Sequence, residues 1–289
     1  MNILGIDLGA TKIALAKYDS KTWQKICETQ IPTENTVEEV IDQLAKLIHE
    51  YRDEETEAIG IGAPGPTING IVEQFPNIPG IKHFNLKSIL EKTLKSPFHL
   101  PITIENDANC FLMGAWQKGK YCDNNNLIGL TLGTGVGGAI ISEGKLIRGE
   151  NGAAGEFGHL LIRDKQTLEE LISGPALARR WEDQFHESSS GEEIVEAAEN
   201  GNQKAMRFLE HVGKDLGIAL ANLILTFNPE VILIGGSAAE ALPFYQDSIS
   251  EIIRKNDQFT GTQIPIVQAN GEDFATFGSA WLAANNNTA

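Results

Sequence analysis

The chain has 289 residues, enough for one large domain or two smaller ones with a substantial buried core. Apolar residues make up 42% of the chain and charged residues 21%, the proportions of an ordinary soluble globular protein. The formal net charge of −16 argues against a nucleic-acid partner, because such binding depends on phosphate neutralisation by lysine and arginine.

The sequence also bears on the compartment. No apolar run approaches the length needed to cross a bilayer. Residues 1–7 have no basic segment ahead of their apolar residues, so we expect a first strand there rather than a signal peptide. Cys27, Cys110 and Cys122 form no close pair, which predicts neither a disulfide framework nor a thiolate metal site. A cytoplasmic protein with reduced, buried thiols and no membrane partner is expected.

The first third of the chain predicts an early sheet. In chain order the patterns indicate a β-hairpin, a third strand, a helix and a fourth strand, at 3–9 with 13–16, 26–31, 36–51 and 58–63. The helix has one apolar face, and Thr36 with Glu39 predicts a capping box at its start. The first 65 residues therefore predict the order β-β-β-α-β.

The rest of the chain partly repeats that beginning. A short strand at 102–104 leads into a helix that starts at Asn106 or Asp107, and a polar loop at 123–126 is a candidate domain boundary. Later elements are expected in the order three strands, a helical region, a buried strand and a last helix, at 127–132, 136–141, 145–147, 168–227, 231–234 and 273–284. Two strand–glycine-turn–strand units, near residues 9 and 135, suggest a duplicated two-domain α/β architecture.

Two segments match the dinucleotide fingerprint G-x-G-x-x-G, at 60–65 and 133–138. Neither has the context that the fingerprint needs, because Pro64 and Pro66 interrupt the first and a strand follows the second. The Walker-type phosphate loop is absent from the sequence. A Rossmann dehydrogenase is therefore a poor interpretation.

Glycine-rich hairpin turns can still hold phosphate, because successive N–H groups point into one concavity that the anion can approach closely. The turns at 7–12 and 132–138 each follow an apolar strand and contain a threonine, and Gly235-Gly236 forms a third glycine turn. Asp7 is placed to hold a magnesium ion, usually through water. Each turn alone could equally be a tight hairpin, but the three together favour phosphate binding.

A series of motifs then identifies a family resemblance over nearly the whole chain. They are Asp7-x-Gly9-x-Thr11-Lys12, Ala63-Pro64-Gly65-Pro66, Pro76-Asn77-x-Pro79-Gly80, Glu105-Asn106-Asp107-Ala108-Asn109, Gly133-Thr134-Gly135-x-Gly137-Gly138, Gly155-Glu156-x-Gly158-His159, Ser173-Gly174-Pro175-Ala176-Leu177 and Asn228-Pro229-Glu230-Val231-Ile232. In this order and spacing the sequence resembles the ROK family of repressors, uncharacterised reading frames and sugar kinases, and its glucokinase-like members in particular.

The resemblance implies a two-domain α/β fold of the actin and hexokinase type, with ribonuclease H-like duplicated domains. A small N-terminal α/β domain is expected at 1–118 plus 272–289, and a larger C-terminal α/β domain at 119–271. A homodimer is also expected.

The resemblance further implies a role for each motif residue. Asp107 would be the base that takes a proton from the attacking sugar hydroxyl. The sugar would be bound by Asn77, Asn106, Glu156, His159 and Glu169. The phosphates would be held by Asp7, Gly9, Thr11, Lys12, Thr134, Gly135, Gly137 and Gly138, while the adenosine would face Gly235 and Gly236. The residue types fit, since phosphoryl transfer needs positioning, charge neutralisation and a base near the nucleophile.

Each role has a structural alternative. Asp107 could simply cap the helix that follows it, and His159 could be an ordinary hydrogen-bonded histidine. Glu169 could be a first-turn helix acid, and Asn77 and Asn106 could be turn residues. The surrounding motifs favour the functional roles for most of them, whereas the two interpretations of Glu169 stay about equally supported.

The sequence departs from the family at two places. Ala10 stands where the family usually has a second glycine, which is tolerable if φ is negative there. Many members also bind zinc through the motif histidine and three cysteines, but residues 160–168 contain no cysteine. Zinc is therefore not expected, and the loop before Glu169 must be ordered by packing or by partner contacts.

These observations predict an ATP- and Mg²⁺-dependent sugar kinase, a phosphotransferase with an alcohol acceptor, and glucokinase in particular. The alternatives are a kinase of N-acetylmannosamine, N-acetylglucosamine, fructose or allose, or a glucokinase that uses polyphosphate. A sugar-sensing regulator of the same family is the non-enzymatic alternative. Such regulators carry a DNA-binding domain ahead of the first glycine turn, and no such domain is expected here because Asp7 lies so near the start.

Overall fold

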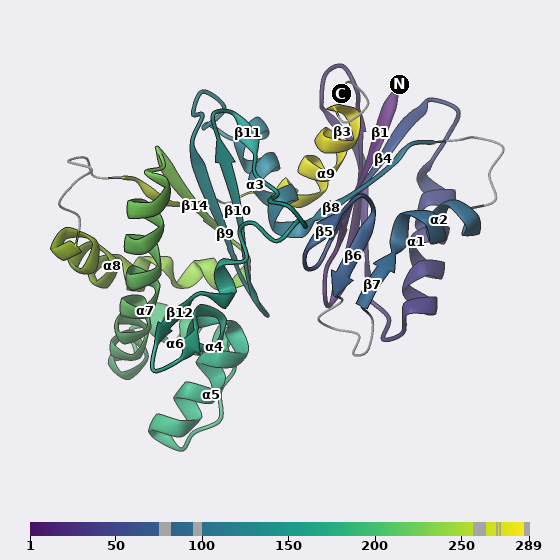
Figure 1. Cartoon of the computed structure of the whole chain (residues 1–289). Coiled ribbons are helices and arrows are strands. Elements are labelled where there is room, and N and C mark those ends of the chain that lie inside the picture. Colours follow the sequence, from purple (N-terminus) through teal and green to yellow (C-terminus); the bar gives the residue numbers. More distant parts are fainter. Residues whose placement is uncertain (75–81, 95–99, 257–263, 270, 272, 286–289) are drawn as a thin grey trace. The chain divides into compact units, whose positions relative to one another are not determined.

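The computed structural model of the protein describes residues 1–74, 82–94, 100–256, 264–269, 271 and 273–285 (Figure 1). The chain splits into two compact units. Unit 1 contains Met1–Asp123, Leu146–Ala154 and Gly271–Ala289, and unit 2 contains Asn124–Lys145 and Gly155–Asn270. The chain thus passes from unit 2 into unit 1 for the short segment Leu146–Ala154 and then returns to unit 2.

Unit 1 is built on a five-stranded sheet of order β3-β2-β1-β4-β8. Its strands are β1 (Asn2–Leu8), β2 (Lys12–Asp19), β3 (Lys25–Pro32), β4 (Thr56–Ala63) and β8 (Ile102–Asn106). The helices are α1 (Val37–Tyr51), α2 (Leu86–Thr93), α3 (Asp107–Lys118) and α9 (Phe274–Asn285). A second sheet of order β5-β6-β7 is formed by Thr67–Ile68, Ile71–Gln74 and Lys82–Asn85. The predicted order β-β-β-α-β is confirmed, whereas the small sheet and α2 were not predicted.

The main sheet of unit 1 is covered on both faces, as Figure 1 shows. Alternate side chains of β1 point to opposite sides: Leu4 joins the core under α1 and α2, while Ile3 joins the core under α9. Both side chains are almost fully buried. This two-sided burial explains why the strands read as nearly continuous apolar runs.

Glycines let α9 approach the sheet at backbone distance. A Cβ at Gly60 would lie 1.9 Å from the carbonyl oxygen of Ser279, and one at Gly5 would lie 1.9 Å from that of Thr276. The glycine at the start of the 60–65 fingerprint therefore serves helix–sheet packing, which agrees with rejecting that fingerprint as a dinucleotide site.

Unit 2 repeats the arrangement with a sheet of order β11-β10-β9-β14-β15. Its strands are β9 (Leu127–Leu132), β10 (Val136–Ser142), β11 (Lys145–Leu146), β14 (Val231–Gly235) and β15 (Ile266–Gln268), and a separate hairpin is made by β12 (Leu161–Arg163) and β13 (Gln166–Thr167). The helices are α4 (Leu168–Ile172), α5 (Gly174–Phe185), α6 (Gly191–Glu199), α7 (Gln203–Phe227) and α8 (Leu242–Asn256), with single 3₁₀ turns η1 (Phe157–His159) and η2 (Ser237–Ala241).

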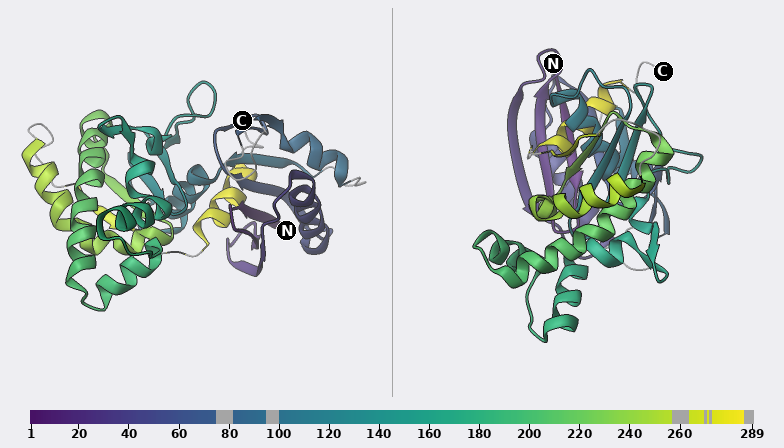
Figure 2. Two further views of the ribbon diagram at one scale, coloured as in Figure 1. Left: turned by 90° about the horizontal axis from the view of Figure 1, so that it is seen from below. Right: turned by 90° about the vertical axis from the view of Figure 1, so that its left-hand side faces the viewer.

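The helices of unit 2 enclose one large apolar core. It joins alternate residues of β9, such as Ile128 and Leu130, to the buried faces of α4, α5, α6, α7 and α8. Helices α7 and α8 lie against each other (Figure 2). They approach closely because α7 has a glycine at the contact, where a Cβ at Gly213 would stand 2.8 Å from Tyr245 Cα. The helical region predicted at 168–227 is confirmed as four separate helices.

Two details of the sequence predictions need correction. Thr36 does cap α1, accepting from the Glu39 N–H, but the Thr36 hydroxyl donates to the Glu39 carboxylate at 2.6 Å, so the contact is not the predicted reciprocal box. Of the three cysteines only Cys110 is buried, whereas Cys122 is exposed. No helix among the described residues has the length and apolar character needed to span a membrane.

Candidate active site

Three acidic side chains of unit 1 gather at the carboxyl end of its parallel strands. Asp7 lies opposite Gly62 in the β1–β4 register, and Gly62 lies opposite Glu105 in the β4–β8 register. Asp107 follows directly as the first residue of α3. Burial, and then the carboxylates of Glu105, Asp7 and Asp107, raise the pKa of the Cys110 thiol. The three carboxylates therefore all lie near Cys110. Ligand sites of parallel α/β sheets occur at this kind of edge.

The strand-to-helix junction separates the capping role from the proposed catalytic one. The side-chain oxygen of Asn106 accepts from the Asn109 N–H at 3.0 Å, so Asn106 is the cap of α3. Its amide nitrogen donates to the Gly65 carbonyl at 3.0 Å. Asp107 stands one residue later and accepts from the Ala108 N–H at 2.7 Å. The N-cap residue of α3 is therefore Asn106 and not Asp107, although Asp107 binds another N–H of the first turn.

A buried ion pair holds this junction in place. Glu105 is almost fully buried and accepts from the Asn106 N–H and the Asn109 amide, both at 3.0 Å. Its second oxygen accepts from Arg148 Nε at 2.6 Å. Arg148 belongs to the segment Leu146–Ala154 that returns to unit 1. Sequence reasoning gave Arg148 no role, because 43 residues separate it from its partner.

The first glycine turn, between β1 and β2, lies beside a carboxylate with an altered pKa. Burial raises the pKa of Asp7 from 3.8 to about 6, and Lys12 partly opposes this rise. The turn is closed by the Gly9 N–H, which donates to the Lys12 carbonyl at 3.0 Å, while Thr33 donates its hydroxyl to the Gly9 carbonyl. Thr11 and Lys12 are exposed.

The second glycine turn, between β9 and β10, contacts a carboxylate from elsewhere in unit 2. The Val136 N–H donates to Glu169 Oε2 at 2.8 Å, and the Gly174 N–H donates to the Gly133 carbonyl at 2.8 Å. A Cβ at Gly135 would stand 2.7 Å from the same carboxylate oxygen. The turn is therefore tied to the first turn of α4 and to the start of α5.

The remaining glycines of the candidate phosphate site have distinct places. Gly137 and Gly138 lie within β10, opposite Thr131 and Leu130. Gly138 makes room for Phe157, whose ring would stand 2.4 Å from a Cβ there. Gly235 ends β14, and Gly236 follows with φ of 89°. Because Gly235 pairs with Thr131 of β9, both glycines lie at the same end of the sheet as the turn.

Three of the predicted sugar residues come together in unit 2. His159 Nε2 lies 3.9 Å from Glu156 Oε2 across η1. Burial raises the pKa of Glu156, His159 lowers it, and the nearby Glu169 raises it again. The Thr167 capping box of α4 uses Glu170, so Glu169 is not the capping acid of that helix. The cluster offers two carboxylates and an imidazole to a polyol.

Other predicted features lie elsewhere. Asn77 falls outside the described residues.

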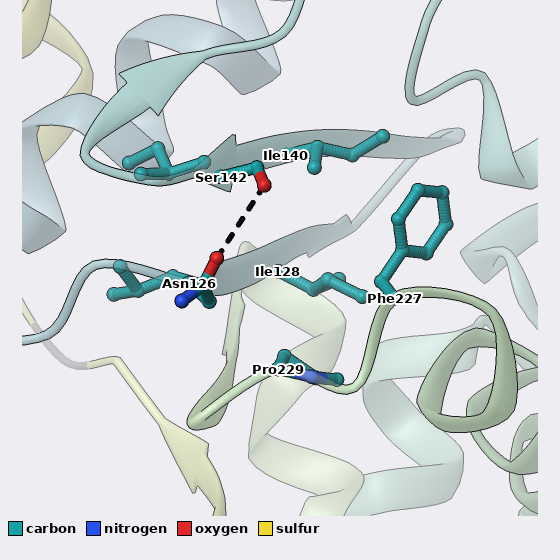
Figure 3. Close-up of a pocket in the computed structure, with 8 residues that line it drawn as sticks. Asn126, Ile128, Ile140, Ser142, Phe227 and Pro229 are labelled. Atoms are coloured by element: carbon teal, nitrogen blue, oxygen red, sulfur yellow. Dashed lines mark hydrogen bonds between the residues drawn. The ribbon is translucent and has the colours of Figure 1, made fainter.

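A small pocket is lined by Asn126, Ile128, Ile140, Phe227 and other residues (Figure 3), and Ser142 donates to the Asn126 side chain across it at 3.4 Å. Since Ile128 lies near the start of β9 and the glycine turn follows its end, this pocket is not the phosphate site. Within the described ranges no three His, Cys, Asp or Glu side chains form a metal-binding group.

The model of the ROK family matches residues 3–286. The chain belongs to the ROK family. The glucokinase of Thermotoga maritima is 31% identical to it over 97% of this chain and 96% of its own. The N-acetyl-D-glucosamine kinase of Pectobacterium atrosepticum is 29% identical over 84% of this chain and 86% of its own.

A solved ROK family structure agrees with this assignment. The ROK family glucokinase from Streptomyces griseus, in complex with glucose and AMPPNP, is 28% identical, with a TM-score of 0.84 over 98% of this chain and 99% of that one. The predicted two-domain α/β fold of the hexokinase type, with two mixed sheets, is confirmed. The chain is thus a glucokinase-like ROK family sugar kinase.

Proposed function

We propose that this ROK family sugar kinase transfers the γ-phosphoryl group of ATP to the 6-hydroxyl of glucose, with Asp107 as the general base. The observation that carries the proposal is the β8–α3 junction, where Asn106 caps the helix and Asp107 follows at its first position. Because Asn106 fills the capping position, we assign the Asp107 carboxylate beside it to the chemistry. The glucokinase of Thermotoga maritima and the glucose-bound relative support glucose as the acceptor.

In the proposed reaction Asp107 accepts the proton of the attacking sugar hydroxyl as the bond from oxygen to phosphorus forms. An ionised carboxylate is needed for this step. The neighbouring Cys110 thiol stays neutral, since burial and the surrounding carboxylates raise its pKa well above the ordinary value. The base therefore has no competing thiolate beside it.

Sugar recognition is assigned to Glu156, His159 and Glu169, together with Asn106 and Asn77. The carboxylates accept from sugar hydroxyls, the imidazole either donates or accepts, and the Asn106 amide keeps one hydrogen beyond its bond to Gly65. A sugar that lacks a matching hydroxyl leaves one of these groups unpaired, at a cost of about 1–3 kcal/mol. That cost is how the site would select its sugar.

Phosphate binding is assigned to the two glycine turns, with Gly235 and Gly236 next to the adenosine. Asp7, Gly9, Thr11 and Lys12 serve in one turn, and Thr134, Gly135, Gly137 and Gly138 in or beside the other. The Asp7 carboxylate fits a magnesium ion, usually through water, because a carboxylate whose burial disfavours its charge gains from a cation beside it. When bound, magnesium neutralises charge on the β- and γ-phosphates. Zinc is not part of the proposal.

An N-acetylglucosamine kinase is the second candidate, favoured by the Pectobacterium relative. A sugar panel with ATP, GTP and polyphosphate as donors separates the alternatives. Glucose with ATP should give the highest kcat/KM, with glucose 6-phosphate as product. A higher kcat/KM for another sugar or for polyphosphate would replace the substrate in the proposal. Glucose binding by calorimetry with no phosphorylation by any donor would overturn the kinase in favour of a sugar sensor.

A further inference from the structure

A buried carboxylate in unit 2 lies outside every role assigned so far. Asp215, near the middle of α7, has a side chain that is only 5% exposed. Its Oδ1 accepts from Arg163 Nε at 2.7 Å, and its Oδ2 accepts from Arg163 Nη2 at 3.3 Å and lies 3.0 Å from Arg180 Nη1. Burying an isolated carboxylate at such a depth is costly, and the two guanidinium groups offset that cost.

Arg163 belongs to the short hairpin that connects two predicted sugar residues. The β12–β13 hairpin begins just after His159 and ends just before Glu169, and its tip, Asp164-Lys165, has positive φ at both residues. The Leu168 N–H closes it by donating to the Leu160 carbonyl at 2.9 Å. Leu161, the first residue of β12, is 68% exposed, whereas Ile162 in the middle of the strand packs against the core of unit 2. The two-point contact of Arg163 with Asp215 adds a polar anchor to this apolar one and ties the hairpin to α7.

Arg180 extends the same anchor to the other side of Glu169. Arg180 Nη1 donates to the Leu171 carbonyl at 2.5 Å, and Leu171 lies two residues after Glu169 in α4. One carboxylate thus holds the segment before Glu169 directly, through Arg163, and the segment after it through Arg180. The Glu169 side chain itself contacts the Val136 N–H at 2.8 Å, so a small shift of α4 would change both the sugar cluster and the glycine turn.

We propose that Asp215 is a positioning residue for the sugar cluster: with Arg163 and Arg180 it fixes the chain on both sides of Glu169 and sets its distance to Glu156 and His159. The inference rests on the proposed sugar-binding function of these three residues. It also supplies a protein contact that orders residues 160–168, a segment that contains no cysteine. Displacing a binding group by about 1 Å can cost on the order of a hundredfold in activity even when the mutation is remote.

The test uses Arg163→Met in the full-length protein. This change removes the guanidinium group through which the hairpin binds Asp215 but leaves Asp215 paired with Arg180. The buried carboxylate therefore keeps a partner, and the fold is retained. The matched control is Arg207→Met, which removes an exposed arginine from the same helix α7. Arg163→Lys, which keeps the charge but loses the two-point geometry, should fall between wild type and Arg163→Met.

Two readouts are needed. Hydrogen exchange of the Leu168 amide reports hairpin anchoring without any substrate, and it should become at least about tenfold faster in Arg163→Met. The glucose KM should rise by about 10- to 100-fold, and the ATP KM should rise less, because Glu169 reaches the proposed phosphate turn only through the Val136 N–H. Arg207→Met should leave both readouts at their wild-type values.

The outcomes separate this inference from the proposed function. Unchanged Leu168 exchange in Arg163→Met would overturn the inference, whatever the kinetics show. Faster exchange with an unchanged glucose KM would also overturn it, since the hairpin would then be anchored without positioning the sugar groups. If the wild-type protein phosphorylates no sugar, the proposed function fails. Calorimetric sugar affinity then replaces KM and decides the positioning role by the same comparison of variants.

Discussion

The two units share one sheet arrangement but carry different chemistry on it. In each, three strands that follow one another in the chain are joined by two later strands that pair in parallel, giving the orders β3-β2-β1-β4-β8 and β11-β10-β9-β14-β15. Unit 1 places the acids Asp7 and Asp107 at the carboxyl end of its sheet, whereas unit 2 places Glu156, His159 and Glu169 near its glycine turn. The repeated framework fixes where a site forms, and the segments inserted after the strands decide what that site contains.

The glycine turns show the same contrast in detail. In unit 1 the turn is braced by Thr33, which follows directly after β3, and the nearby Asp7 carboxylate has a raised pKa. In unit 2 the turn is braced by the Glu169 carboxylate and by the start of α5. In the proposed function, this contact of Glu169 with the turn would link sugar binding to phosphate binding in unit 2. In unit 1 the turn lies beside Asp7, the proposed magnesium ligand.

If unit 1 supplies the chemistry, its base should give the largest effect in the molecule. Asp107→Asn keeps the size of the side chain and removes its proton-accepting charge. Turnover should fall by about 10²- to 10⁴-fold, the usual contribution of a general base. Steady-state kcat with the preferred sugar measures this, and circular dichroism checks that the variant is folded.

Asp42→Asn is the matched control for that substitution, since Asp42 is an exposed acid on α1 of the same unit. Its turnover should equal that of the wild type. Near-normal turnover of a folded Asp107→Asn variant would remove Asp107 from the mechanism and, with it, the division of labour between the units.

Asp7 should behave as a group whose charge lowers the stability of the ligand-free fold. The folded protein holds this acid's proton more tightly than the unfolded chain does, so the free energy of unfolding falls as pH rises from about 4 to 6. The shift from 3.8 to about 6 corresponds to about 3 kcal/mol. Asp7→Asn should therefore raise the ligand-free stability at pH 7.5 by up to that amount, with no gain near pH 3.5.

Urea unfolding of Asp7→Asn at both pH values, without nucleotide, measures the difference. The variant should at the same time lose magnesium-dependent activity, so that stability and function move in opposite directions. Asp42→Asn, an exposed acid, should change stability little at either pH. A loss of stability in Asp7→Asn at pH 7.5 would mean that the ionised carboxylate is a structural partner and not a poised metal ligand.

The sequence predicted more of the framework than of the contacts that tune it. Strongly periodic or fully apolar segments, such as those of α1 and β14, were located correctly. The sheet β5-β6-β7 was missed because strands of two to four residues are too short to show a period. Helix α2 was missed for the same reason, because its eight residues give only about two turns of periodicity.

The site divides in the same way. Adjacent motif residues such as Asn106 and Asp107 could be found, because their spacing along the chain is itself the signal. The partners of Glu105, Glu169 and Asp215 could not, since 43, 33 and 52 residues separate them from Arg148, Val136 and Arg163. Nothing local in the sequence marks which arginine reaches which buried acid.

The smallest effect is expected at His159, the most exposed member of the sugar cluster of unit 2, with a side chain that is 71% exposed. If no metal holds its ring, it is available to a sugar hydroxyl, and His159→Gln removes one hydrogen bond. The sugar KM should rise by about tenfold, which corresponds to about 1.4 kcal/mol, with kcat and melting temperature little changed.

Elemental analysis should find no stoichiometric zinc in the wild-type protein, and a zinc-selective chelator should leave its melting temperature unaltered when magnesium is in excess. One zinc per chain, or unfolding of either protein on chelation, would instead make His159 a metal ligand. The order of the hairpin after it would then depend on the metal, not on the Arg163–Asp215 pair.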